Sequence, residues 1–171
     1  GLFDVRARLV AEIDQDIALG DADAAADLID ALRTLPDAAD DVAQLEASLK
    51  TLVKVRPMLA RAAGLLQQGK VDQPRGESAL DMYREVQQLD PQNAVAEQGI
   101  FQVQRAVLDR ALAAVAQNDF AGADRELAEA QTIRPGSQQM LDVHKRVDDM
   151  REQRANGVLA QARSALDAGN I

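Results

Sequence analysis

A short apolar pattern that ends in proline recurs three times along this 171-residue chain. The clearest copy places Ala123, Leu127 and Ala130 at spacings of four and three residues, with Pro135 five residues further on. Those spacings put the three side chains on one stripe of an α-helix. Proline then ends the helix, because it has no backbone N–H and disfavours α geometry in the residue before it. The pattern therefore predicts short amphipathic helices that stop at defined points.

Two earlier stretches carry the same pattern, which we call the ladder. These copies are Ala79, Tyr83, Val86 and Pro91, and then Ala24, Leu28, Ala31 and Pro36. Hydrophobic residues make up 47% of the chain but aromatic residues only 2%, so alanine, leucine and valine must fill the interior. Alanine and leucine favour helices, and runs of β-branched residues are scarce. We expect an all-α protein with essentially no β-structure.

Helix signals between the ladders predict seven helical segments, long and short in alternation. We expect helices over residues 3–19, 22–34, 38–68, 78–89, 94–117, 120–133 and 137–168. Within the third segment, Pro57 should kink or break the helix near Arg56. Asn156-Gly157 marks a second point where a long helix could bend.

Polar residues and glycines mark the expected helix ends. Gly20 suits the left-handed position after a helix, and Asp21 or Asp23 can cap the helix that follows. Further N-caps are expected at Asp37, at Asn93, and at Ser78, which has Asp81 three residues later as a capping pair, and Ser137 is expected to start the final long helix.

An alanine stands seven residues before each of three expected turns, at Gly69, Asn118 and Gly169. These alanines are Ala62, Ala111 and Ala162. Small residues there let two antiparallel helices approach closely. Together with the ladder and its proline, this arrangement resembles the tetratricopeptide repeat, a helix–turn–helix unit of about 34 residues. The best-matching stretches are residues 89–94 (LDPQNA) and 118–123 (NDFAGA).

This resemblance implies a single α-solenoid of antiparallel helical hairpins over residues 1–171. Its units would span about 3–36, 38–91, 92–135 and a truncated 137–171. The prolines lie 55 and 44 residues apart, and the family's aromatic positions hold Met58, Val107 and Val158. We therefore expect degenerate repeats with elongated first helices.

Residues 65–94 also look like a segment of the tetratricopeptide stalks in proteobacterial membrane proteins. That resemblance implies a bacterial protein on the periplasmic side of a membrane anchor, with the cytoplasm as the alternative. No run of about 18 apolar residues occurs that would span a bilayer. Because the first residue is Gly1 rather than Met, we expect the chain to be a trimmed fragment of a longer protein.

The sequence contains no residue pattern that indicates catalysis, metal binding or nucleic-acid binding. A net charge of −9 argues against binding nucleic acid or an anionic membrane, and cysteine is absent. His144 is the single histidine, on a polar helix face. Asp21 and Asp23 begin like a calcium loop, but Leu32 stands where the bidentate glutamate belongs. We expect no enzyme, no cofactor and no metal.

A binding scaffold remains, with a protein or peptide held on the inner wall that the first helices of such repeats form. The candidate wall residues are Leu59, Leu66, Leu108, Leu112, Val115, Leu159, Arg163 and Leu166. The competing interpretation is that these leucines pack against the ladder helices.

A structural coiled-coil spacer or oligomerisation stalk is the alternative function. It would use Met140, Val143, Val147 and Met150, which keep a 3-4-3 spacing that Arg154 interrupts. Because the fourth unit is truncated, the final helix should expose apolar surface at Leu159 and Leu166, or pack on a neighbouring molecule as a homo-oligomer.

Overall fold

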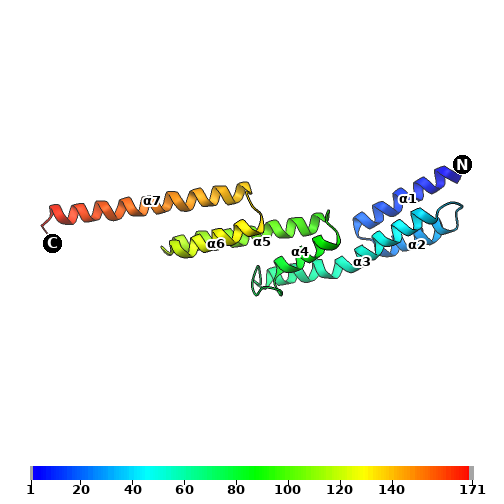
Figure 1. Ribbon diagram of the computed structural model, residues 1–171, viewed down its shortest axis with the longest axis horizontal. Coiled ribbons are helices and arrows are strands. Elements are labelled where there is room, and N and C mark those ends of the chain that lie inside the picture. Colours follow the sequence, from blue (N-terminus) through cyan, green and yellow to red (C-terminus); the bar gives the residue numbers. More distant parts are fainter. Residues whose placement is uncertain (1, 170–171) are drawn as a thin grey trace.

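The computed structural model describes residues 2–169, and over that range the chain forms seven α-helices and no strand (Figure 1). The helices are α1 (Leu2–Leu19), α2 (Ala22–Arg33), α3 (Ala39–Gln67), α4 (Ala79–Leu89), α5 (Ala94–Ala116), α6 (Phe120–Ile133) and α7 (Gln138–Asp167). The predicted all-α class and the alternation of long and short helices are confirmed. Gly1 and residues 170–171 lie outside the described range.

Helices pack only on the next helix along the chain or on the one after that. The result is an elongated row in which the N-terminus and the end of α7 lie at opposite ends (Figure 1). The long helices α3 and α5 are each shared, because the first half of each packs on the preceding helices and the second half on the following ones. We call one such packed group a unit. A unit consists of the second half of one long helix, the short helix that follows it, and the first half of the next long helix. In the first unit, α1 takes the place of the long-helix second half.

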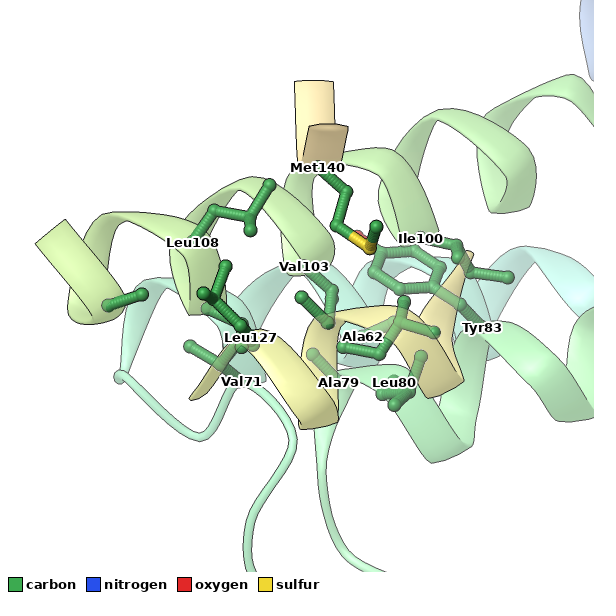
Figure 2. Close-up of a cluster of buried hydrophobic side chains, with 14 of the residues drawn as sticks. Ala62, Val71, Ala79, Leu80, Tyr83, Ile100, Val103, Leu108, Leu127 and Met140 are labelled. Carbon is green, nitrogen blue, oxygen red and sulfur yellow. The ribbon is translucent and has the colours of Figure 1, made fainter. Parts of the chain in front are cut away.

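Two separate hydrophobic cores result from this sharing. The N-terminal core comprises Ile13, Ala25, Ile29, Leu32, Ala38, Val42 and Leu45. The main core collects side chains of α3, α4, α5, α6 and α7, with the loop residue Val71, and Figure 2 shows part of it. Helix α3 joins the two cores, since Leu45 lies in the first and Val55 in the second.

The long helices all end in the same turn. Gly20, Gly69, Asn118 and Gly169 have positive φ angles of 80°, 77°, 61° and 67°. They lie 49, 49 and 51 residues apart along the chain. In each turn this residue's N–H donates to the carbonyl three residues earlier, at 2.8 to 3.1 Å. Left-handed backbone of this kind is a common way to end a helix and reverse the chain, and glycine adopts it without strain.

The ladder prediction is correct in two copies and wrong in the first. Ala79, Tyr83 and Val86 are buried, and so are the ladder residues of α6. In α2 the buried residues are instead Ala25, Ile29 and Leu32, each one position after the predicted set, and Ala31 is exposed. Both sets have spacings of four and three, so packing against α1 and α3 selects the register.

Three of the predicted caps form, and Ser137 caps α7 in addition. Ser78 and Asp81 make a capping box, and the side chains of Asp21, Asn93 and Ser137 each accept a backbone N–H from the first turn of their helix. These contacts satisfy N–H groups that have no partner within the helix.

The N-cap prediction at Asp37 is wrong. Asp37 takes a left-handed φ of 57°, and α3 begins after Ala38, whose methyl group makes no capping hydrogen bond. The capping box also affects Asp81. Burial favours the neutral acid, but hydrogen bonds from the Ser78 hydroxyl and from the N–H groups of Gly76 and Ser78 hold the pKa of Asp81 below its usual value.

Long helices α3 and α7 are continuous through the two predicted weak points. Pro57 lies inside α3, and Gly157 lies inside α7. Pro57 cannot donate a hydrogen bond to the carbonyl of Val53, but the residues on either side of Pro57 stay helical. The break expected near Arg56 is therefore absent.

The alanine that lies seven residues before a turn can be tested by substitution, because a small residue there is expected to let two helices approach closely. Ala111 is fully buried between α5 and its neighbours, whereas Ala162, at the same place in α7, is exposed. Ala111→Leu should therefore destabilise the fold by about 1–3 kcal/mol through overpacking, and Ala162→Leu should change stability by less than about 0.5 kcal/mol. Urea unfolding of both variants measures the difference, and equal midpoints would show that the helices do not meet at Ala111.

Gly99 is required by the ring of Tyr83. A Cβ built at Gly99 would lie 2.3 Å from the Tyr83 Cζ atom, and both positions belong to the α4–α5 contact. Gly99→Ala should cost about 1–3 kcal/mol despite the better helix propensity of alanine. Gly64→Ala is the matched control, because nothing lies within 4 Å of its Cβ, and this change should stabilise by about 0.5–1 kcal/mol. Opposite shifts in the thermal midpoint are expected, and a stabilised Gly99→Ala variant would contradict the tyrosine contact.

Candidate partner-binding site

Titratable groups form no candidate catalytic or metal site in the described range. No group of three or more histidine, cysteine, aspartate or glutamate side chains there is arranged to hold a metal ion. His144 is exposed on α7, and its Nε2 lies 3.4 Å from Asp148 Oδ2, one helical turn away. Such a pair on a solvated face is a common surface contact.

An ion pair with a buried carboxylate ties the long loop between α3 and α4 to α5. The side chain of Asp72 is 3% exposed, and its Oδ1 lies 2.8 Å from Arg110 Nη2 on α5. The same guanidinium nitrogen lies 2.9 Å from Glu126 Oε2 on α6. Arg110 therefore ties the loop and α6 to α5.

Eight wall residues were predicted from the sequence, and the structure divides them into three groups. Leu108 and Val115 are buried in the main core, and Leu59, Leu66 and Leu112 are partly buried against it. Leu159, Arg163 and Leu166 are exposed on α7. The structure therefore does not bring the eight together on one open wall. Leu108 and Val115 pack as the competing interpretation expected, and whether any of the eight contacts a partner stays a prediction.

A groove of about 800 Å³ lies between the first two units. The end of α1, the middle of α3 and the turn from α4 to α5 form its walls. Its apolar lining includes Leu19, Leu52, Val55, Leu59, Leu89, Pro91 and Val95. Arg56 crosses from α3 to the end of α1, where its Nη1 lies 3.4 Å from the carbonyl oxygen of Gly20. Leu59 is the one predicted wall residue that reaches this groove.

The corresponding surface between the second and third units is filled from within the chain. Phe101 stands where α3 has Leu52, each 17 residues before its turn, and Arg134 stands where the other unit has Asp90. The Arg134 guanidinium lies 5.3 Å from the centre of the Phe101 ring. The hollow beside this pair measures about 390 Å³. Phe101 and Arg134 are larger than Leu52 and Asp90. The junction between the second and third units is therefore closed, and the junction between the first two units is open.

A buried amide completes the closed junction. Gln104 is fully buried at the place that Val55 takes in the open junction. Its Nε2 donates to the carbonyl oxygens of Ala130 and Arg134, both at 2.9 Å, and its Oε1 accepts from the Ser137 hydroxyl at 2.8 Å. Sequence analysis missed this residue, although a glutamine on the apolar stripe of a buried helix is a signal that can be looked for.

Comparison with known proteins gives no match to any family model, curated protein or solved structure. No described helix combines the length and the apolar character needed to cross a membrane. The candidate site is therefore defined by geometry alone.

Substitution of Leu108 tests whether this side chain belongs to the hydrophobic core or to a partner-binding wall. Leu108 is fully buried, so Leu108→Ser should cost roughly 2–5 kcal/mol and lower the melting temperature clearly. Leu159→Ser removes the equivalent side chain of α7, which is 56% exposed, and should leave the melt nearly unchanged. Circular dichroism melts of both variants measure this. A Leu108→Ser variant that melts like the parent would return Leu108 to the list of wall residues.

Proposed function

We propose that this protein is a non-enzymatic scaffold of the tetratricopeptide type that holds a peptide segment of a protein partner. The observation that carries the proposal is the open groove between the first two units, because the equivalent junction further along the chain is closed by its own side chains. Buried alanines before the turns and the interval of about 50 residues between turns support the repeat assignment. The array is then a right-handed solenoid with elongated first helices.

The closed junction indicates the chemistry of the occupant. There, an aromatic ring covers the α5 surface and a guanidinium stacks on it. In the open junction Leu52 leaves room for a ring, and Asp90 offers a carboxylate where Arg134 stands in the other unit. We infer that the partner segment carries an aromatic or large apolar anchor with a basic residue nearby. Apolar contact supplies most of the affinity, because most of the residues that line the groove are apolar.

A coiled-coil spacer is the less favoured alternative. Met140 and Val147 are buried in the main core, and Val143 and Met150 pack against it. This stripe is therefore used within the chain, and pairing between chains would have to break those contacts. The resemblance of residues 65–94 to periplasmic stalks is the basis for proposing the periplasmic side of a bacterial membrane as the location.

A peptide library tests the groove directly. Random 12-residue peptides displayed on phage and selected on this protein should yield binders with an aromatic anchor. Val95→Asp places a charge on the groove wall, in the first turn of α5 where an acidic residue suits the helix dipole, and should weaken those binders at least tenfold. Val53→Asp is the matched control, since Val53 is 57% exposed against 60% for Val95 and lies outside the groove.

A variant whose groove is filled by its own side chains should no longer bind the selected peptides but should keep its thermal stability. Leu52→Phe combined with Asp90→Arg installs the residues of the closed junction and should abolish binding while the melting temperature stays within a few degrees. Affinity should change little between low and high salt, because exposed ion pairs contribute weakly. Selection of no binders, or binders that respond equally to Val95→Asp and Val53→Asp, would refute the groove as the partner site.

A further inference from the structure

Two charged side chains of opposite sign line the open groove between the first two units. The end of α1 and the start of α5 lie next to one another along α3 at this groove (Figure 1). Arg56 stands at the α1 side, where it contacts the end of α1, and Asp90 stands at the α5 side, in the turn from α4. The other residues of the lining are uncharged. The groove therefore has a cation at one side and an anion at the other.

Neither of these two charges is neutralised by an ion pair within residues 2–169. The Arg56 guanidinium has five N–H donors, and its one hydrogen bond, to the Gly20 carbonyl, is 3.4 Å long and exposed. The Asp90 carboxylate accepts one hydrogen bond, from Asn93 Nδ2 at 2.9 Å. The ends of α1 and α5 offset each charge only in part, because a helix end carries about half an elementary charge. Both side chains can therefore pair with charges of a partner.

The closed junction carries a different pair of charges at the same two places. Arg105 takes the place of Arg56, since each stands 13 residues before its turn, and Arg134 takes the place of Asp90. Both charges there are positive, and Arg134 lies over the Phe101 ring. Opposite charges at these two places thus occur in the open junction and not in the closed one.

We propose that Arg56 selects partner segments that carry an acidic side chain, and that Arg56 and Asp90 together fix the direction of the bound segment. The segment crosses the groove with its apolar anchor over Leu52 and Val55, its acidic residue at Arg56 and its basic residue at Asp90. Acidic and basic residues therefore stand on opposite sides of the anchor in the partner's sequence. This inference rests on the proposed function of the groove, to which it adds the acidic residue and the direction.

Exposed charge pairs of this kind determine which partner binds, and in which orientation, more than they raise affinity. The apolar anchor can therefore supply most of the affinity while the charges discriminate between segments. A segment whose acidic residue is replaced by a basic one meets repulsion at Arg56, and its anchor still fits. Discrimination between two such peptides is the quantity to measure.

Parallel selections test the acidic residue. The phage library is selected on the protein and on its Arg56→Glu variant, and peptides are kept as groove binders only where Val95→Asp in the same background weakens them. Binders to the parent should carry aspartate or glutamate on one side of the anchor and lysine or arginine on the other. Binders to Arg56→Glu should lose the acidic residue and carry basic residues on both sides.

Calorimetric titration of synthetic peptides measures the discrimination. A parent binder is compared with the same peptide in which lysine replaces the acidic residue, both amidated so that only a side chain supplies the carboxylate. The parent should bind the acidic peptide about tenfold more tightly. Arg56→Gln keeps a donor for the Gly20 carbonyl but removes the charge, and it should bind the two peptides within about threefold. Arg56→Glu should prefer the lysine peptide.

Arg105→Glu is the matched control, because Arg105 is also exposed and stands at the equivalent place of α5. This variant should keep the parent's preference, and circular dichroism melts check that all variants fold. Equal effects of Arg56→Glu and Arg105→Glu would overturn the proposal, since net charge alone would then explain them. Groove binders without an acidic residue, or a preference that Arg56→Gln leaves unchanged, would overturn it while the groove remains a binding site. Selection of no groove binders would overturn both proposals.

Discussion

Sharing of the long helices α3 and α5 between two units is the constraint on which this structure depends. A helix of 29 residues, as in α3, is long enough to pack one half against α1 and α2 and the other half against α4 and α5. If α3 broke at Pro57, Leu45 of the N-terminal core and Ala62 of the main core would no longer belong to one rigid element. The helix stays continuous at Pro57, although the carbonyl of Val53 loses its backbone donor there. Continuity of the helix thus sets the shape of the groove beside it.

Helix positions were predictable from the sequence because their ends carry local chemistry. Asn93 and the pair Ser78 and Asp81 satisfy backbone groups within a few residues, so no distant contact is needed to place those boundaries. Asp37 failed as a cap because a second local option, the left-handed turn, competed with it. The register of α2 was not predictable. In ADAAADLIDALR two stripes have the same spacing, and only the packing of Ile29 against the N-terminal core distinguishes them.

Predicting the candidate site was harder for a related reason. A long helix that touches two or three neighbours is apolar on several faces, so the leucines of α5 look alike in sequence whether they face a partner or the core. Leu108 turned out to be fully buried and Leu159, at the equivalent place, exposed, and the difference lies entirely in what covers the helix. The groove was invisible for another reason, since it arises from the size of Leu52 relative to Phe101 across units that are far apart in sequence.

The two junctions differ in how firmly they are held, which bears on why the open one suits a partner. Gln104 makes three hydrogen bonds that fix α5 against the turn between α6 and α7, and a buried amide of this kind tolerates little change in geometry, because any lost partner leaves a desolvated polar group. Val55, at the same place in α3, makes only non-directional contacts. Apolar contacts accept small shifts at low cost, whereas the amide network does not. The closed junction is therefore held by directional hydrogen bonds of a buried side chain, whereas at Val55 the open junction depends on apolar packing.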